Sequence, residues 1–585
     1  MQEENVRKCF DKDIKVTLDI VLATVREFES SMLDTQLVAR IFILRNFTFE
    51  GVEPYLKFHL YHWGVRPVIS FGGYDLIEQD LIMDRSMLHD FKPDVVVVGI
   101  VLDTLDKNYG IPGWQCTQAM ERLQSIFALV SQKIKVPVIV NTFIPPLYSE
   151  HGLFAPPDYS DMYSQVSKLN HFIRDYVRNN SFQFILADWE RCLCIVGEKM
   201  AIDYRSWYLH KAPFHTGFLN VVGEGMAHAV RLLKGNVKKC LVLDCDNTLW
   251  GGVVGEDGLE GIKLDSNSYP GQVYYDFQRS VIHLAGRGVM VALCSKNNEE
   301  DVWKVLRDHP YCLLKRNNLV AWKINWNDKV TNLRKLAVEL NIGLDSIVFV
   351  DDSPTECEYI RQALPEVTIL LVPKKLQYFP NMLFRLGLFG TLTLSKEDHE
   401  RVVQYQHVVK RQELMAECQN IEVFIASLDL ICDVRNLDFK DISRVAQLTQ
   451  KTNQFNLTIH RYSETEVTSM LSSQECSVYT LRVSDKFGEY GLSGVLIARW
   501  EERKVLIDTL LLSCRVLGRN VERSFVAECL KRLVSERNVE VWEAEYVFSK
   551  KNVQVADFWE SLGFDVVAEN GVRKVYRKDA NKLQL

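Results

Sequence analysis

Residues 242–258 read VLDCDNTLWGGVVGEDG, and this stretch is the strongest indication of the fold in the middle of the chain. Its apolar start ends in two carboxylates one residue apart, Asp244 and Asp246. Because side chains alternate along a strand, we expect both carboxylates on one side and Cys245 on the other. Two adjacent carboxylates repel each other unless a cation compensates them. The stretch therefore predicts a buried strand that ends in a cation-dependent site.

Polar residues also follow other strand-like runs of this region. Ser295 and Lys296 end ALCSKN, Asp351 and Asp352 end FVDDSP, and Lys329 lies between these runs in NWNDKVTN. The runs alternate with amphipathic, helix-like stretches, which predicts an open α/β domain over residues 236–375. In such a domain ligands bind outside the carboxyl ends of the strands. We therefore expect these side chains to meet at one edge of a sheet.

These residue types suit phosphoryl transfer. Asp244 could attack phosphorus as a nucleophile, and Asp246 could protonate the leaving oxygen and later accept a proton from water. The predicted Mg²⁺ ligands are Asp244, Asp246, Asp351 and Asp352. The predicted phosphate-binding residues are Thr248, Ser295, Lys296 and Lys329. The competing interpretation is that the acids are turn and helix N-cap residues.

Composition limits the other functions. The chain has 585 residues, which is too long for a single hydrophobic core. A net charge of -7 and a pI of about 6.1 argue against a nucleic-acid-binding protein. The apolar runs are too short to span a membrane, the N-terminus lacks the apolar core of a signal peptide, and 14 scattered cysteines fit a reducing compartment. We expect a cytoplasmic protein.

The pattern of apolar and polar residues divides the rest of the chain into three regions. Residues 1–235 alternate β-branched runs with helix-like segments, which predicts a second parallel α/β domain. Residues 376–420 read as a helical connector. Residues 421–585 read as an antiparallel meander followed by a helix and further strands, which predicts an α+β domain.

The middle region resembles the HAD-superfamily phosphotransferases, with DCDNT in place of their DxDxT, followed by Ser295, Lys329 and the DD pair. DNTLWGGVVGEDGLEGI, LCSKNNE, FVDDSPTE, DWERC, WYLHKAPFH and KTNQFNLT are similar to FkbH-like proteins, over residues 180–580 or so. This resemblance implies Asp244 as the aspartyl nucleophile, Asp246 as the acid and base, and Asp351 and Asp352 as metal-site acids. It also implies that Mg²⁺ takes the backbone carbonyl of Asp246.

The same resemblance implies a substrate and a partner. FkbH-like proteins take D-1,3-bisphosphoglycerate, remove phosphate and load the glyceryl group onto the phosphopantetheine thiol of an acyl carrier protein in polyketide biosynthesis. Two alternatives remain open: a phosphatase of a small phosphorylated metabolite, and a non-catalytic scaffold of a synthase complex.

The surroundings of the motif bear on this chemistry. Trp250, Gly251 and Gly252 are expected to form a flap beside the nucleophile, and the short intervals between the motifs leave no room for a large cap. Cys294 and Cys245 are candidates for an acyl thioester, although a cysteine in such a position is more often a buried packing thiol than a nucleophile. Direct transfer to the carrier thiol is the alternative.

The flanking domains resemble two further families. Residues 1–235 look like an SGNH hydrolase that has lost catalytic residues. Thr48 stands where the family has its Ser, and Ala212 stands three residues before His215, where the family has an Asp. We therefore expect a non-catalytic scaffold or docking domain. The C-terminal region resembles the GNAT acyltransferases through CRVLGRNVE and FWESLGF. In that family the turn that matches Arg515 and Gly518 cradles the CoA pyrophosphate at a helix N-terminus, although Asn520 here replaces the final small residue of the turn. The residues expected to hold the carrier or its pantetheine arm are Asn453, Gln454, Asn456, Arg515 and Gly518.

Overall fold

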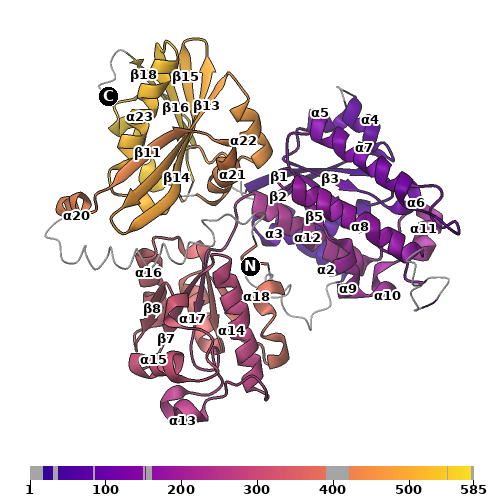
Figure 1. Cartoon of the computed structure of the whole chain (residues 1–585), viewed down its shortest axis with the longest axis horizontal. Coiled ribbons are helices and arrows are strands. Elements are labelled where there is room, and N and C mark those ends of the chain that lie inside the picture. The colour runs from indigo at the N-terminus through magenta and orange to yellow at the C-terminus, as the bar shows by residue number, and fades with distance from the viewer. Residues whose placement is uncertain are drawn as a thin grey trace. The chain divides into compact units, whose positions relative to one another are not determined.

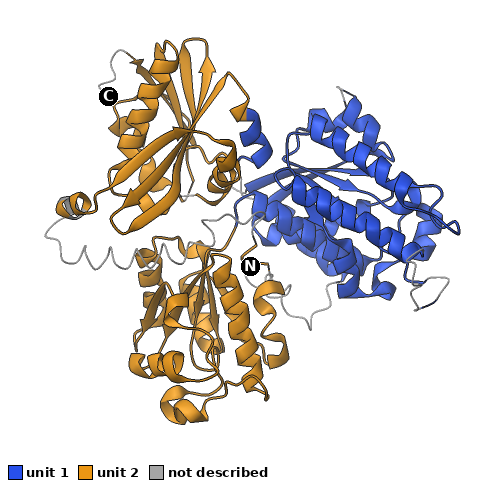
Figure 2. Ribbon diagram, in the orientation of Figure 1, with its two compact units in different colours: residues 1–236, 461–469 blue, residues 237–460, 470–585 orange. Residues whose placement is uncertain are grey.

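The computed structural model describes residues 17–30, 37–83, 86–148, 152, 161–385, 387–390, 421–452, 454–549 and 551–580. Three sheets organise these residues (Figure 1). The chain forms two compact units, one of residues 1–236 with 461–469 and one of residues 237–460 with 470–585 (Figure 2).

The first sheet belongs to the N-terminal unit and has the strand order β2-β1-β3-β4-β5. All of its neighbouring strands are parallel. The strands are β1 (Leu37–Arg45), β2 (Val65–Tyr74), β3 (Val95–Gly99), β4 (Val138–Asn141) and β5 (Phe184–Ala187). Each residue of β3 is buried, as expected for a continuous apolar run in a parallel sheet.

Helices cover both faces of this sheet. α4 (Ile77–Ile82), α5 (Met87–Phe91), α7 (Thr117–Lys133) and α8 (Met162–Asn179) contribute to one apolar core with β1, β3 and β4. α2 (Leu18–Ser30) and α12 (Thr216–Leu233) each pack on α3 (Glu53–His62). The shorter helices are α6 (Leu102–Leu105), α9 (Trp189–Val196), α10 (Glu198–Ala201) and α11 (Tyr204–His210).

The second sheet has the strand order β10-β9-β6-β7-β8 and is also parallel. Its strands are β6 (Cys240–Leu243), β7 (Met290–Ser295), β8 (Ala321–Ile324), β9 (Ile347–Asp351) and β10 (Thr368–Leu371). Its helices are α13 (Val254–Gly261), α14 (Gly271–Gly286), α15 (Glu299–Asp308), α16 (Lys329–Glu339), α17 (Pro354–Ala363) and α18 (Met382–Arg385). The central strand β6 is buried along its whole length, which places its carboxyl end at the centre of the domain.

The third sheet runs β11-β13-β14-β15-β16-β18-β17, with β12 paired to β15 beside this path. Its strands are β11 (Ile431–Asn436), β12 (Phe455–Asn456), β13 (Cys476–Asp485), β14 (Gly488–Glu501), β15 (Lys504–Leu512), β16 (Val541–Val547), β17 (Asp565–Glu569) and β18 (Arg573–Asp579). Its helices are α20 (Ile421–Ser427), α21 (Ile442–Lys451), α22 (Glu464–Leu471), α23 (Val521–Glu536) and α24 (Phe558–Ser561). β15 and β16 are parallel, and the other neighbouring pairs are antiparallel.

Some expectations fall outside the described residues. Asn453 and residues 391–420 of the expected connector are among these. Among the helices that the structure describes, none combines the length and apolar character needed to span a membrane.

Candidate active site

The switch point of the second sheet lies between β6 and β9. The chain moves from β6 to β7 and β8 on one side, and later to β9 and β10 on the other. Ligands of open α/β sheets bind at such a point, outside the carboxyl ends of the strands. Asp244 directly follows β6, and Asp351 ends β9. The fold therefore delivers two carboxylates to the position where a ligand is expected.

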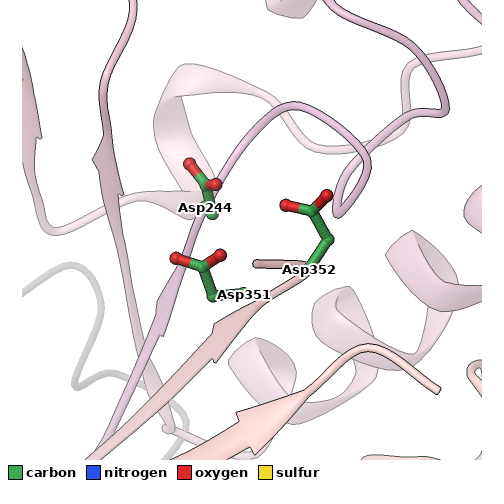
Figure 3. Close-up of side chains that lie close together, drawn as sticks. All are labelled: Asp244, Asp351 and Asp352. Atoms are coloured by element: carbon green, nitrogen blue, oxygen red, sulfur yellow. The ribbon is translucent and has the colours of Figure 1, made fainter. Parts of the chain in front are cut away.

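Three carboxyl groups meet at this point (Figure 3). Asp244, Asp351 and Asp352 each offer an oxygen, and these oxygens lie within 4.8 Å of one another. Asp244 and Asp351 are buried, whereas Asp352 is half-buried. Such a spacing suits a small cation with oxygen ligands.

Lys329 supplies the positive charge inside the cluster. It begins α16, is buried, and donates hydrogen bonds from Nζ to Asp244 Oδ2 at 3.0 Å and to Asp351 Oδ2 at 2.6 Å. Burial would lower the pKa of Lys329, but the two carboxylates raise it above its ordinary value. Lys329 therefore stays charged and ties the strand ends β6 and β9 together.

One lysine does not balance three carboxyl groups. Burial raises the pKa of Asp244, although Lys329 opposes this effect. Burial and the neighbouring Asp244 raise the pKa of Asp351, and burial and Asp351 raise that of Asp352. A divalent cation would reverse these shifts, because a nearby positive charge favours the ionised form. The donor set therefore fits a hard divalent cation with oxygen ligands.

Asp246 lies apart from this cluster and is held by donors of its own. Its Oδ1 accepts hydrogen bonds from Trp250 Nε1 at 2.8 Å and from the backbone N–H of Val254 at 3.0 Å. Its Oδ2 accepts one from Asn297 Nδ2 at 2.9 Å. The prediction had placed Asp246 among the metal residues, but its carboxylate is not among the three grouped oxygens. This separation gives the two carboxylates of the DCD motif different surroundings, as different chemical roles require.

The flap is a compact turn closed by its own polar groups. Asn247 adopts a φ of 52°, and its Oδ1 accepts from the N–H of Gly252 at 2.9 Å. Gly251 lies so close to the Tyr274 ring that a Cβ would approach it to 2.8 Å. Gly252 has a φ of 96°, which favours glycine. The two glycines thus permit the chain to fold back while Trp250 points to Asp246.

The predicted phosphate-binding residues occupy different positions. Thr248 is fully buried, and its hydroxyl has no hydrogen-bond partner among the described residues. The Ser295 hydroxyl interacts with Asp244 and lowers the pKa of that carboxyl. Lys296 instead forms an ion pair with Glu356 of α17, with Nζ 2.5 Å from Oε1. Ser295 and Lys329 therefore flank the nucleophile candidate, while Lys296 is engaged elsewhere.

The structure corrects the candidate role of the two cysteines. Cys245 and Cys294 are both completely buried, and Cys294 belongs to the apolar core of the domain. Burial raises the pKa of each thiol far above its ordinary value. A thiol rather than a thiolate is therefore present, and a thiol is a poor nucleophile. For Cys294 the physical reason is strand alternation within β7, which directs its side chain into the apolar core and the next one, Ser295, to the other side.

Sequence reasoning missed Asn297. Its side chain is buried and donates to Asp246 Oδ2 and, at 3.2 Å, to Ser295 Oγ, so it links two site residues. Its position two residues after Ser295 was the available signal, because residues i and i+2 of an extended chain point to the same side.

The expected pyrophosphate cradle of the C-terminal domain is filled by the chain itself. Gly518 has a φ of 73°, and its backbone N–H donates to Glu522 Oε1 at 2.7 Å. Glu522 lies in the first turn of α23, where an anion would otherwise sit. Arg515 donates from Nε to Ser513 Oγ at 3.2 Å. The carboxylate of Glu522 therefore takes the place that the prediction gave to a ligand phosphate.

The expected arm-binding loop is also part of the sheet. β15 and β16 pair only from Lys504 to Ile507 and then separate. Residues 455–457 enter this gap: Leu457 N–H donates to Leu510 O, and Val547 N–H donates to Leu457 O, at 3.1 and 2.7 Å. Asn456 is fully buried, and its Oδ1 accepts from the N–H of Ile459 at 2.9 Å. The prediction that Asn456 holds a pantetheine arm is thus corrected, because its amide serves its own chain.

Gln454 precedes this inserted strand. Its backbone carbonyl accepts from Gln554 Nε2 at 3.3 Å, and its side-chain Oε1 is buried without a hydrogen-bond partner among the described residues. The structure therefore places Gln454 at the entry of the inserted strand, whereas Asn453 lies outside the described residues.

The N-terminal sheet has its switch point between β1 and β3, and side chains close it. Asn46 Nδ2 donates to Val101 O at 3.0 Å, and Val101 N–H donates to Asn46 Oδ1 at 2.8 Å. Thr48 Oγ1 donates to the backbone carbonyl of His210 at 2.6 Å, and exposed His215 is the N-cap residue of α12. These polar groups fasten backbone segments to one another.

Comparisons with known proteins agree with the geometry of the middle domain. Residues 239–368 match the family model described as NLI interacting factor-like phosphatase. Together with the geometry of the site, this match shows that the middle domain is a HAD-superfamily phosphatase domain. No curated protein matches the chain.

A search of solved structures found matches to the chain. The N-terminal part of the protein BF1531 from Bacteroides fragilis, which contains a phosphatase domain and was solved with Mg, is 23% identical, with a TM-score of 0.58. The match covers 65% of this chain and 100% of that chain. Ribosomal-protein-S18-alanine N-acetyltransferase from Escherichia coli is 12% identical, with a TM-score of 0.21, over 26% of this chain and 94% of its own.

Proposed function

We propose that this protein is a Mg²⁺-dependent enzyme that dephosphorylates D-1,3-bisphosphoglycerate and loads the glyceryl group onto the phosphopantetheine thiol of an acyl carrier protein. The observation that carries the phosphoryl-transfer part is the separation of Asp244, which faces Asp351, Asp352 and Lys329, from Asp246, which has its own donors. The substrate, the carrier and a role in polyketide or tetronate-type biosynthesis come from the resemblance to FkbH-like proteins, and the cytoplasm as the location comes from the composition of the chain.

The residues of this chain divide the phosphoryl chemistry among them. Asp244 attacks phosphorus, so that an aspartyl phosphate forms as the bond between phosphorus and the substrate oxygen breaks. Asp246 gives its proton to that oxygen and later takes one from the water that hydrolyses the aspartyl phosphate. Lys329 and Ser295 stabilise the charge on the phosphoryl oxygens. The products are free phosphate and the regenerated carboxylate of Asp244.

Asp244, Asp351 and Asp352 would hold the Mg²⁺ ion. When bound, Mg²⁺ neutralises charge on the phosphoryl group and keeps the nearby carboxyl groups ionised.

Acyl transfer uses the second phosphate of the donor. The carrier thiolate attacks the carbonyl carbon of the acyl phosphate, the bond from that carbon to the phosphate oxygen breaks, and the phosphate leaves. Burial of Cys245 and Cys294 supports direct transfer to the carrier rather than an enzyme thioester. Residues 249–294, all of which the structure describes, hold only α13 and α14 as helices. The absence of a large cap from this insertion supports access by a macromolecular substrate.

A second candidate is a phosphatase of a small phosphorylated metabolite without a carrier. The hydrogen bond from Gly518 N–H to Glu522 and the burial of Asn456 favour it, because residues that were expected to hold a pantetheine arm are engaged within the chain. In that case the C-terminal domain is a structural module. The N-terminal domain, which we take to be a non-catalytic SGNH-like scaffold, then also has a structural role only.

Intact-mass spectrometry of a phosphopantetheinylated acyl carrier protein tests the proposal. The carrier is incubated with the enzyme, Mg²⁺ and 1,3-bisphosphoglycerate, with the Asp244→Asn variant and a carrier that lacks its arm as controls. A gain of one glyceryl group without phosphate supports the proposal. A carrier of unchanged mass together with released phosphate supports the metabolite phosphatase instead.

A further inference from the structure

Helix α11 has an unusual surface for a helix of a folded domain. Its sequence is YRSWYLH, and none of its residues is buried. Tyr208 is 76% exposed, Leu209 62% and Tyr204 50%. Large apolar side chains gathered on a surface are typical of an interaction site rather than of a face in contact with water.

The preceding helices extend this apolar surface. Ile195 at the end of α9 is 65% exposed, and Met200 of α10 is 42% exposed. Glu198 of α10 joins α10 to α11, because its Oε1 accepts from the Tyr204 hydroxyl at 3.3 Å and its Oε2 from the Tyr148 hydroxyl at 2.7 Å. We call residues 189–211 the α9–α11 surface.

The charge on the α9–α11 surface has one sign. Within residues 189–211, all of which are described, the exposed residues with a permanent charge are Arg191, Lys199, Arg205 and Lys211. The acidic residues of this segment are only half-exposed and are engaged within the unit. Glu190 pairs with Arg174, Glu198 accepts from two tyrosines, and Asp203 accepts from Ser206. The outward charge is therefore basic, around apolar side chains.

The surface is also fixed in place before any partner arrives. Asp203 caps α11 by accepting from Ser206 N–H at 2.9 Å. At the other end Thr48 Oγ1 donates to His210 O at 2.6 Å, and Thr48 N–H donates to Lys211 O at 2.9 Å. These bonds fasten α11 to the segment that follows β1. A preformed surface binds with less loss of conformational entropy than a mobile one.

We propose that the α9–α11 surface docks an acidic helical protein, namely the carrier protein of the proposed function. Its partner must present apolar side chains for Tyr208 and Leu209 and carboxylates for Arg205 and Lys199, and an acidic carrier protein meets both requirements. Complementary charge speeds association, and the apolar centre supplies affinity. The inference rests on the proposed function only for the identity of the partner. It gives the N-terminal domain a role that its closed switch point does not supply.

Two variants test this docking site in the full chain: Arg205→Glu and Tyr208→Ala. The affinity of a phosphopantetheinylated acyl carrier protein is measured by titration calorimetry, and glyceryl transfer is followed in parallel. We expect each variant to weaken carrier binding at least about tenfold and to raise the KM for the carrier to match. Phosphate release from a small substrate should be unchanged, because neither residue lies in the middle domain.

The control is Lys135→Glu, an exposed lysine before β4 and so at the opposite end of the same parallel sheet from α9. It should bind the carrier like the wild type. Unchanged affinity in Arg205→Glu and Tyr208→Ala, with transfer intact, would overturn the docking site and leave the proposed function standing. Loss of binding in these variants supports the site even if no glyceryl group is transferred. A wild-type dimer that both variants dissociate would show that a second copy covers the surface, and would overturn the proposal.

Discussion

Asp246 is held by three donors, and this arrangement makes Asn297 a positioning residue for the proposed acid. Asn297→Ala removes the donor to Asp246 Oδ2 and the link to Ser295. We expect kcat for an alkyl phosphate to fall by about 10²-fold, the usual contribution of general acid catalysis. Hydrolysis of p-nitrophenyl phosphate should fall much less, because its leaving oxygen needs little protonation.

Steady-state kinetics on the two substrates measures this difference, with Trp250→Phe as a second variant that removes another donor to the same carboxylate. Equal losses on both substrates would indicate a general structural defect and contradict the positioning role.

Lys329 affects stability as well as catalysis. Lys329→Met leaves Asp244 and Asp351 buried without their ion-pair partner. We expect the free energy of unfolding in EDTA to fall by about 3–5 kcal/mol, the usual result of removing one partner of a buried pair. Mg²⁺ should recover part of this loss, because it binds the same carboxylates.

Urea unfolding with and without Mg²⁺ measures both effects. Lys323→Met is the matched control, since Lys323 pairs with Glu339 at a half-exposed site and should cost less than about 1 kcal/mol. Similar losses in the two variants would show that burial of the Lys329 ion pairs does not govern stability, and would contradict this prediction.

Residue identity predicted part of the site well for a physical reason. Polar residues at the carboxyl ends of parallel strands converge, so the sequence could bring Asp244, Ser295 and Asp351 together. It could not show which donors each carboxylate receives, because hydrogen bonds depend on the path of the flap. Because the sequence does not give these hydrogen bonds or the burial of side chains, it did not point to Asn297, and it left Cys245 and Cys294 as candidates for catalysis.

At the scale of elements, the inserted strand β12 is the feature that sequence reasoning could not foresee. Asn552, which is fully buried, donates from Nδ2 to Asn456 O and to Val547 O, both at 2.9 Å. It therefore links the inserted segment to β16. Asn552→Ala should lower the free energy of unfolding by about 3 kcal/mol, because buried backbone carbonyls lose their donors.

The unfolding transition of the C-terminal domain measures this effect. Gln554→Ala is the control, since exposed Gln554 makes a single 3.3 Å bond to the same segment, and it should cost under about 0.5 kcal/mol. A loss in Asn552→Ala no larger than in the control would show that the inserted strand is loosely held.

Helix packing in the N-terminal unit predicts a pH dependence. His59 of α3 is buried against Asn220 of α12, with Nε2 2.9 Å from Oδ1, and burial lowers its pKa from 6.5 to about 4. Between these values the unfolded chain binds a proton that the folded chain does not. Stability is therefore full above pH 6.5 and falls as the pH falls toward 4, by about 2 kcal/mol at pH 5.

Hydrogen exchange of peptides from α3 and α12 at pH 7 and pH 5 measures this loss after correction for intrinsic exchange. His59→Gln keeps a donor to Asn220 without the titration and should reduce the difference between the two pH values. An unchanged difference in this variant would assign it to other groups, of which His228, with a pKa also lowered to about 4, is the first.

Elements with long apolar runs were predictable, and short ones were not. DVVVVGI and VPVIVNTF contain β3 and β4. By contrast, β5 and β8 have mixed burial, whereas β4, which is equally short, is buried throughout, so β5 and β8 do not stand out from their surroundings. The pairing of β12 with β15 joins residues far apart in the sequence, which periodicity does not register.

At the scale of the whole molecule, the sequence predicts boundaries near residues 235, 375 and 420. The described strands form separate sheets over residues 37–187, 240–371 and 431–579, and the second and third sheets belong to one compact unit. The change from parallel to antiparallel sheets could be predicted from the sequence, because the connections between parallel strands must contain helices. The filled cradle and the closed N-terminal switch point were not visible, since both depend on side chains meeting across elements.

The central claim is that Asp244 is the nucleophile of a Mg²⁺-dependent phosphoryl transfer. Phosphate release from 1,3-bisphosphoglycerate by the full chain, with and without Mg²⁺ and above the rate without enzyme, tests it most directly, beside Asp244→Asn and the control Asp276→Asn, whose half-buried carboxylate pairs with Arg279 of the same helix. We predict release by the wild type and the control only with Mg²⁺, and at least about a 10³-fold loss in Asp244→Asn with folding intact. Release by Asp244→Asn at the wild-type rate, or release that persists in EDTA, would contradict the account.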